Sequence, residues 1–120
     1  MYVVEHARLA PSHIPGIEHR TVASAAQGLA HLSVWCQAIE PGSATPPHRH
    51  DCEEVVVVLA GHGRLVIDGV AHPFGPDTTL VIPAEVDHQI FSDGPGLLHC
   101  VAALAATPVA VFLPAGTPLD

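Results

Sequence analysis

Lysine is absent from this sequence, and its fixed positive charges come from only four arginines, set against twelve acidic residues. The formal net charge is −8 at pH 7 with the histidines neutral. A nucleic-acid-binding protein needs a basic face, which this composition cannot supply, and anionic membrane surfaces are disfavoured for the same reason. A lysine Schiff base is excluded too. We therefore expect no nucleic-acid partner and no membrane partner.

Cysteine is scarce, and no segment resembles a leader or a membrane anchor. The three cysteines are Cys36, Cys52 and Cys100. They lie far apart, are odd in number and form no CxxC pair, which argues against a disulfide framework. Glu5 and His6 stand where a signal peptide needs an apolar core. The apolar stretch 101–113 is too short for a membrane span. These features predict reduced thiols and a cytoplasmic protein.

Helix-period patterns of useful length are also missing. The apolar runs are short, rich in valine and bounded by glycine, proline and aspartate, which is typical of an all-β protein. The predicted strands lie near 29–40, 46–51, 53–60, 63–68, 78–82, 87–92, 97–104 and 108–113. Asp68-Gly69 is a strong signal for a tight hairpin turn. Eight short strands joined by tight turns predict a closed or double-sheet β-barrel in a chain of one-domain size.

The run from Val55 to Leu59 is apolar at both parities. One face of that strand must line the barrel, and the other must be covered by a second sheet or by another subunit. We expect a homodimer through this sheet. Residues 1–28 show few strand signals and several prolines, so they are expected to form an N-terminal arm that packs on a partner. The remaining residues, 29–120, are expected to form the single domain.

Against these absences, the chain holds ten histidines, two of them in a conspicuous motif. His48, His50 and Glu54 share one parity, so on an extended strand their side chains lie on one face. Another imidazole, His88, follows in PAEVDHQIFS. Neutral imidazole nitrogens and a carboxylate oxygen are a ligand set for a borderline divalent metal. The residues alone therefore predict a metal site.

The spacing of this motif also resembles a known family. Gly42, His48, His50, Glu54 and Gly61 match the first signature motif of the cupin family at every fixed position. The similarity extends over about residues 29–104. It implies the small cupin β-barrel, a double-stranded β-helix of the jelly-roll type.

The second cupin motif is matched in part. Pro83 and His88 stand at its proline and histidine positions. Asp77 and Glu85 occupy its two usual glycine positions, and Ser92 replaces the closing asparagine. These departures affect the expected turn geometry more than the expected ligands.

The resemblance implies that one metal lies among four side chains, and these are His48, His50, Glu54 and His88. Three imidazoles and one carboxylate leave one or two positions of an octahedral ion open for water, dioxygen or a chelating substrate. The set suits Fe, Mn, Ni, Co or Zn, and ligand type alone does not select among them.

Several other polar side chains have two interpretations each. His31 and His99 fall inside predicted strands, where each is either a pocket residue beside the ligands or a wall histidine. Cys52 shares the parity of the ligands and is either a thiolate ligand or a buried inert thiol. The remaining histidines of the N-terminal segment are expected to be solvated, and they are His6, His13 and His19.

The two arginines near the motif are assigned to the surface or to the substrate. Arg49 lies between the ligands with opposite parity, so it should point outward and pair with Asp51 or Glu53, at little gain in stability. Arg64 is a candidate to reach a carboxylate substrate.

Membership of the cupin family would be compatible with many reactions, and the residues that this sequence lacks exclude some of them. The only tyrosine is Tyr2. The metal-free sugar-nucleotide epimerases of the superfamily use a histidine and tyrosine pair with basic residues, and phosphomannose isomerases use a lysine, so both classes fit poorly. Thiol dioxygenases replace the carboxylate that Glu54 supplies here.

Metal chemistry on a small, weakly charged substrate remains. The leading hypothesis is a dioxygenase-type oxidation of an enediol, diketone or phenolic compound, with Glu54 as the catalytic base. The first alternative is a redox-neutral, metal-dependent isomerase, lyase or decarboxylase. The second is a non-catalytic cupin that binds a small molecule.

Overall fold

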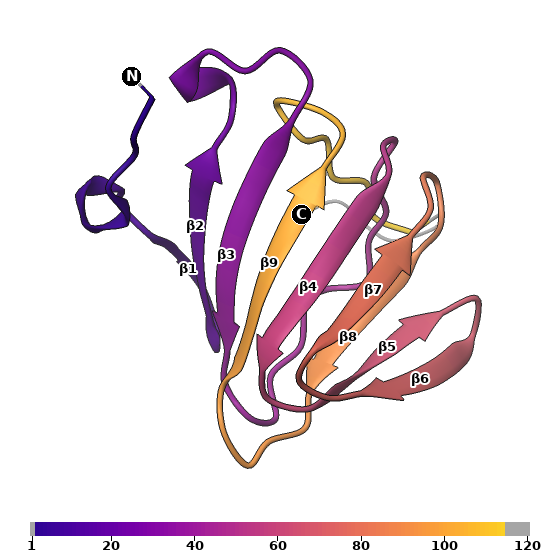
Figure 1. The fold of residues 1–120 in the computed structure, drawn as a ribbon. Coiled ribbons are helices and arrows are strands. Elements are labelled where there is room, and N and C mark those ends of the chain that lie inside the picture. The colour runs from indigo at the N-terminus through magenta and orange to yellow at the C-terminus, as the bar shows by residue number, and fades with distance from the viewer. Residues whose placement is uncertain (1, 115–120) are drawn as a thin grey trace.

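Nine strands and two short 3-10 helices form the described part of the chain, residues 2–114 of a computed structural model (Figure 1). The strands are β1 Ser12–Ile14, β2 Ile17–Ala23, β3 Ser33–Ile39, β4 Glu54–Ala60, β5 Gly63–Ile67, β6 Val70–Phe74, β7 Thr78–Ile82, β8 His88–Ser92 and β9 Leu98–Leu104. The helices are η1 His6–Arg8 and η2 Ala25–Gln27. None of the helices within 2–114 has the length and apolar character to cross a membrane.

The strands form two antiparallel sheets around one core. The larger sheet has the order β1-β2-β3-β9-β4-β7, and the smaller one has the order β6-β5-β8. Buried aliphatic side chains from β3, β4, β7, β8 and β9 fill the interior. The prediction of an all-β protein with a double-sheet, jelly-roll type of β-barrel is confirmed.

Strand β4 shows how the sequence pattern produces the sheet. Its inward side chains, Glu54, Val56 and Val58, alternate with outward ones, and it pairs with β7 on one side and β9 on the other. Valine and other β-branched residues favour this central position because they pack well on a pleated surface. The hairpin turn at Asp68-Gly69 also forms where predicted, with φ values of 53° and 73° at its two central residues.

The N-terminal segment departs from the expected arm. Residues 12–14 and 17–23 are strands, and β2 pairs with β3 from Ile17↔Ile39 onward. Ile17 and Val22 are buried in this sheet. Much of the segment 1–28 is therefore part of the larger sheet. The physical reason is that backbone pairing with β3 and burial of two aliphatic side chains outweigh the weak local strand signal.

Two expected strands are reduced to isolated pairs. In 46–51, only His48 and Arg49 pair, with His88 and Phe112 respectively. Pro46 and Pro47 have no backbone N–H to donate, which prevents a regular ladder there. The expected strand 108–113 consists of the pairing at Phe112 alone. The strand β6 was not predicted, because its side chains are mostly exposed and it contains a proline.

Two of the three departures from the second cupin motif fall at strained backbone positions. Asp77 has a φ of 62° and Glu85 a φ of 67°, both in the left-handed region that glycine adopts most easily. The backbone N–H of Glu85 donates to the carbonyl of His50 at 2.7 Å. The turn geometry of the motif is therefore kept without its glycines, and the Glu85 turn lies against a candidate ligand.

Candidate metal centre

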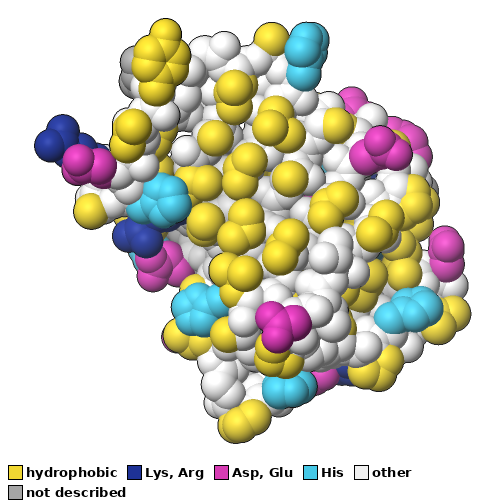
Figure 2. Space-filling view, in the orientation of Figure 1, with side chains coloured by type: hydrophobic (Ala, Val, Ile, Leu, Met, Phe, Trp, Pro, Cys, Tyr) yellow, Lys and Arg dark blue, Asp and Glu magenta, His cyan; other side chains and the backbone are white. Residues whose placement is uncertain are grey.

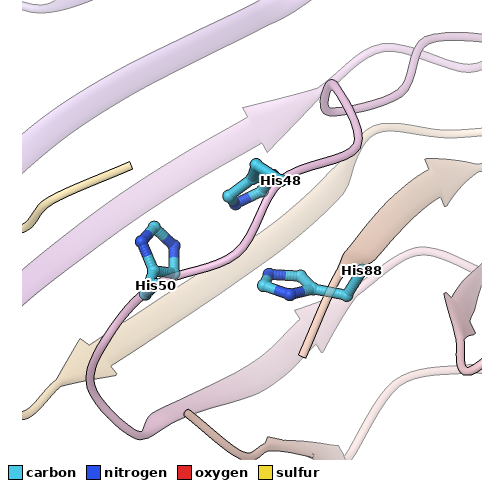
Figure 3. A group of neighbouring side chains, drawn as sticks. All are labelled: His48, His50 and His88. Atoms are coloured by element: carbon cyan, nitrogen blue, oxygen red, sulfur yellow. The ribbon is translucent and has the colours of Figure 1, made fainter. Parts of the chain in front are cut away.

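Three histidines meet at one end of the space between the sheets. His48 and His50 come from the segment before β4, and His88 is the first residue of β8. The backbones of His48 and His88 pair through two hydrogen bonds, of 3.1 Å and 2.8 Å. One nitrogen of each ring lies within 4.8 Å of the others, and Figure 3 shows the rings turned toward a common point. These three residues could hold a metal ion.

The Nδ1 atom of each ring, which faces away from the common point, forms a hydrogen bond with a backbone carbonyl. The Nδ1 atoms of His48, His50 and His88 lie 2.7, 2.8 and 3.0 Å from three carbonyl oxygens. The carbonyls belong to Pro46, Ala110 and Val86, in that order. Because a carbonyl only accepts, each neutral ring carries its proton on Nδ1 and directs the lone pair of Nε2 inward. This arrangement orients imidazoles as metal ligands in general.

The fourth predicted ligand, Glu54, begins β4 on its inward face. Its Oε1 lies 3.6 Å from the Nε2 of His50 and 3.4 Å from the Nε2 of His88. Both the His50 Nε2 and the Glu54 Oε1 are buried and find no hydrogen-bond partner within residues 2–114. Buried polar atoms without partners are costly, and a bound cation would satisfy them. The donor set therefore fits a divalent metal, and metal ligation by these four side chains remains a prediction.

The charges around the centre act differently on the histidines. Burial lowers the pKa of His48, and the neighbouring His88 and His50 reinforce that direction. Burial also opposes a charge on His88, but the Glu54 carboxylate and the Val86 carbonyl near its ring, together with the charge of Asp87, outweigh burial and raise the pKa of His88. Without a metal, His88 therefore takes up a proton more readily than His48 does. A metal has to displace that proton.

A cavity of about 310 Å³ opens beside His48 and His50, against one face of β1, β2 and β3. Its main apolar walls are Trp35, Ile14, Ile17 and Val111. Its polar walls include His19, Gln37 and Thr45. The rings of Trp35 and His50 pack edge to face, with 5.9 Å between their centroids. The cavity thus offers an apolar, partly aromatic chamber that reaches two of the candidate ligands.

His19 is a wall residue that sequence reasoning missed. It was expected to be solvated, but it is half-buried, its pKa is lowered by burial, and its ring packs 4.9 Å from Trp35 between centroids. Its Nδ1 lies 3.0 Å from the Nε2 of Gln37, and its Nε2 lies 3.1 Å from the hydroxyl of Thr21. Its alternation with Ile17 along β2 was the signal that could have revealed it.

The other candidates lie apart from the centre. His31 is exposed before β3, and His99 is exposed on the outer face of β9, so neither orients a ligand. Cys52 is buried with the aliphatic core, which agrees with an inert thiol. Arg64 pairs with Asp93 at 3.0 Å and lies over the Phe91 ring. These contacts occupy Arg64 at the surface.

Arg49 differs from its predicted role. It was expected to pair with Asp51 or Glu53, but its guanidinium lies 3.8 Å from Glu85 and 3.7 Å from Asp87. The reason is that residues 48 and 49 pair with β8 and with the C-terminal segment instead of continuing a regular strand.

The outer face of the larger sheet is exposed and apolar, whereas the metal centre is buried and polar. Hydrophobic side chains gather over β3, β9 and β4, with charged groups mainly at the margins (Figure 2). The exposed ones include Val55, Val57 and Leu59 of β4 and Val81 of β7. A contiguous exposed apolar patch of this kind usually marks an interaction surface.

Comparisons with known proteins agree with the motif and the geometry. A family model described as auxin binding protein matches residues 6–116. Auxin-binding protein 1 of Arabidopsis thaliana is 35% identical over 109 residues, which cover 82% of this chain and 55% of the relative. Auxin-binding protein T85 of Nicotiana tabacum is 36% identical over 110 residues, covering 82% of this chain and 59% of the relative. The chain thus spans little more than half the length of these relatives.

Solved structures share the fold at low identity. The polyketide cyclase RemF of Streptomyces resistomycificus superposes with a TM-score of 0.81 at 20% identity, covering 100% of this chain and 87% of RemF. A cupin-2 domain protein of Rhodospirillum rubrum gives a TM-score of 0.73 at 20% identity, covering 84% of this chain and 67% of that one. The predicted cupin resemblance is therefore confirmed.

Proposed function

The chain belongs to the auxin-binding protein family within the cupin superfamily, and on that premise we propose that it binds a small organic molecule at a metal. The metal is one divalent transition ion, such as Fe, Mn, Ni, Co or Zn, held by His48, His50, Glu54 and His88. When bound, the ion would supply a positive charge that attracts and polarises a ligand oxygen. The rest of the ligand would occupy the cavity beside His48 and His50.

One observation carries the metal part of this proposal. The His50 Nε2 and the Glu54 Oε1 are buried 3.6 Å apart without hydrogen-bond partners in the described chain. A fold that only needed stability would replace such a pair with aliphatic groups, often at no cost. The three carbonyl contacts that fix the imidazoles support the same conclusion, because they leave every Nε2 free to ligate.

The size and lining of the cavity support the ligand class. Its main walls are aliphatic and aromatic, while Gln37 and Thr45 supply a few polar contacts. Such a cavity suits a largely apolar molecule, and the metal side suits an anionic oxygen such as a carboxylate or an enolate. The relatives named for auxin binding support a small organic ligand of this general kind.

The test combines metal analysis with ligand titration. We expect purified protein to contain close to one equivalent of a transition metal, and His48→Ala to contain none. Auxin and a series of aromatic carboxylates would then be titrated calorimetrically into metal-loaded and chelator-treated protein. Binding should require the metal. Equal affinity for the metal-free protein, or full metal content in His48→Ala, would contradict the proposal.

Catalysis is the second candidate, and Glu54 favours it. Glu54 is a buried carboxylate whose Oε1 lies 3.4 Å from the Nε2 of His88 and 3.6 Å from that of His50. Because His50 lines the cavity, a substrate bound close to the imidazoles could pass a proton to Glu54. Dioxygenase-type oxidation of an enediol, diketone or phenolic compound, or a redox-neutral isomerase, lyase or decarboxylase reaction, would use such a base. Oxygen uptake and product analysis across those compounds distinguish them. A lack of turnover with every compound that binds would leave only the binding function.

A second copy of the chain is the proposed partner for the outer face of the larger sheet. Val57 and Leu59 on β4 and Val81 on β7 are exposed there to 41%, 58% and 70%. Two such faces related by a twofold axis would cover one another without burying a charge from β4. Analytical ultracentrifugation should find a dimer. A monomer at high protein concentration would contradict the proposal. The cytoplasmic location remains a prediction from the cysteine pattern.

A further inference from the structure

The segment that follows β9 returns to the metal-site loop. Residues 109–113, here called the C-terminal strap, lie beside the histidine motif. The backbone N–H of Arg49 donates to the carbonyl of Phe112, and that of Phe112 donates to the carbonyl of Arg49, each at 2.9 Å. Val111, which lies between Ala110 and Phe112 in the sequence, lines the cavity. The strap is thus attached to the loop that carries His48 and His50.

The side chain of Arg49 secures the strap at its far end. Its Nη1 donates to the carbonyl of Leu113 at 3.1 Å, and its guanidinium lies 5.4 Å from the centroid of the Phe112 ring. The carboxylates of Glu85 and Asp87 lie within 4 Å of the same guanidinium. A planar guanidinium can serve a carbonyl, a ring face and carboxylates together, which an ammonium group does poorly. Arg49 therefore connects the strap to the Glu85 turn.

Among the three imidazoles, His50 depends most on a distant segment. The carbonyls that accept from His48 and His88 lie two residues earlier in the chain, at Pro46 and Val86. The carbonyl that accepts from His50 belongs to Ala110 of the strap, sixty positions away in sequence. The orientation of His50 is thus only as secure as the position of the strap.

We propose that Arg49 is a positioning residue for the metal centre and acts through the C-terminal strap. By holding the strap, Arg49 keeps the Ala110 carbonyl against the Nδ1 of His50, and this contact keeps the Nε2 of His50 directed at the metal. The inference rests on the proposed metal site. Removing a group that orients a ligand typically weakens metal binding about 10- to 100-fold.

The strap also connects metal binding to the organic ligand. A molecule that packs against Val111 would hold the strap in place and so favour the oriented form of His50. By reciprocity, the metal would raise the affinity for that molecule by the same factor. Cavity and metal centre would therefore bind their ligands cooperatively, with the strap as the shared element.

Metal affinity in four variants tests the proposal. Arg49→Met and Phe112→Ala should bind cobalt about 10- to 100-fold more weakly in competition with a chelator. The matched control is Arg64→Met, which removes an arginine with a similar ring contact and carboxylate pair but no contact with the strap. Its affinity should not fall. Loss of a positive charge alone would strengthen cation binding, so weaker binding in Arg49→Met cannot come from charge. Phe112→Leu should retain most of the affinity.

A spectroscopic readout separates positioning from a general loss of structure. In nitrogen-15 spectra of the metal-free protein, the Nδ1–H proton of His50 should exchange faster with water in Arg49→Met than in the parent. The corresponding protons of His48 and His88 should be unaffected, because their carbonyl partners are local. Equal acceleration at all three rings would overturn the proposal.

Two outcomes distinguish this inference from the proposed function. If His48→Ala loses the metal but Arg49→Met and Phe112→Ala keep the parental affinity, the strap does not position His50 and the inference is wrong. If His48→Ala itself keeps the metal, the proposed metal site is wrong and the inference fails with it.

Discussion

The two faces of strand β4 contrast sharply. Its inward residues Glu54, Val56 and Val58 are at most 5% exposed, whereas the outward Val55 and Leu59 are 37% and 58% exposed. The same seven residues thus place a carboxylate inside and a row of aliphatic side chains outside. Each face departs from the usual distribution, in which charges are exposed and large aliphatic groups are buried.

The contrast shows how two kinds of function can be read from one strand. The buried carboxylate costs stability unless a cation accompanies it, so it indicates a ligand inside the molecule. The exposed valines affect folding stability little, but a contiguous apolar patch in contact with water is unfavourable. The patch therefore indicates a protein partner on the outer face. Features that folding alone does not explain are the most informative ones.

The largest expected effect comes from removing the inner carboxylate. Glu54→Leu should weaken metal binding by about 100- to 1000-fold. A four-ligand site binds its metal with a free energy of about 10–16 kcal/mol, and the variant loses the share contributed by one ligand. At a pH where His88 is neutral, the metal-free variant should be no less stable than the parent, since a buried carboxylate oxygen without a hydrogen-bond partner is replaced by an aliphatic group. Chelator competition and urea unfolding measure the two quantities.

The neighbouring exposed residue gives the control for that experiment. Glu53→Leu removes a negative charge of the same kind from the adjacent position, where the side chain is exposed. It should leave both quantities unchanged. A metal-free Glu54→Leu protein that is less stable than the parent would mean that Glu54 supports the fold by itself.

A second comparison uses strand β7, which pairs with β4. Ile82 is 2% exposed and points into the core, whereas Val81 is 70% exposed on the outer face. Ile82→Ala should cost about 2–5 kcal/mol in unfolding free energy, because it leaves a cavity. Val81→Ala should cost less than about 0.5 kcal/mol when measured on the monomer. Similar losses at both positions would show that the outer face is covered within the single chain.

A charge on the outer face should break the proposed dimer with little effect on folding. Val57→Glu would bury an unpaired carboxylate between two copies, which costs about 3 kcal/mol or more and so weakens dimerisation by about 100-fold. Val70→Glu, at a 53% exposed position on β6 of the smaller sheet, is the control. Sedimentation velocity over a range of concentrations measures both. A dimer that survives Val57→Glu must use another surface.

The last expected effect is confined to alkaline pH and concerns the thiols on the two faces of the sheet. Burial, reinforced by Glu54 and Cys36, raises the pKa of Cys100 to about 12 from its ordinary 9.0. The unfolded chain therefore releases this proton first as pH rises above 9.0. The stability contributed by the protonated thiol is present below that pH and is lost toward about 12, by about 1.4 kcal/mol per pH unit.

Urea unfolding at several alkaline pH values tests this effect. Cys100→Ala should lack the Cys100 contribution to the slope, whatever its absolute stability. Cys36, half-buried on the outward side of β3, should react with iodoacetamide in the native protein, while Cys100 should not. An identical slope in Cys100→Ala would contradict the assignment.

Sequence reasoning recovered the features that depend on local pattern. The valine-rich run predicted a strand over 53–60, where β4 forms. The motif spacing predicted neighbouring ligands, and the structure groups His48, His50 and His88, with Glu54 close to two of them; metal ligation itself stays a prediction. Such inferences succeed because strand parity and motif spacing are encoded in neighbouring residues.

The features that it missed depend on contacts between distant segments. His19 became a cavity wall because β2 pairs with β3, and Arg49 turned toward the strap because Phe112 pairs with its backbone. Neither pairing has a local signal in the sequence. Asp77 and Glu85 are intermediate: the motif gave the positions, and only the structure shows that non-glycine residues adopt the left-handed turn there.

The hydrogen bond between His50 and Ala110 also has a consequence for the order of events during synthesis. Contacts between residues far apart in sequence form late, after the loop between them has closed. On the ribosome, His50 emerges long before Ala110, and N-terminal segments begin to fold first. The complete ligand set is therefore available only after nearly all of the domain has been made. Metal uptake would thus mark the end of folding, and a nascent chain stalled before Ala110 should bind the ion weakly.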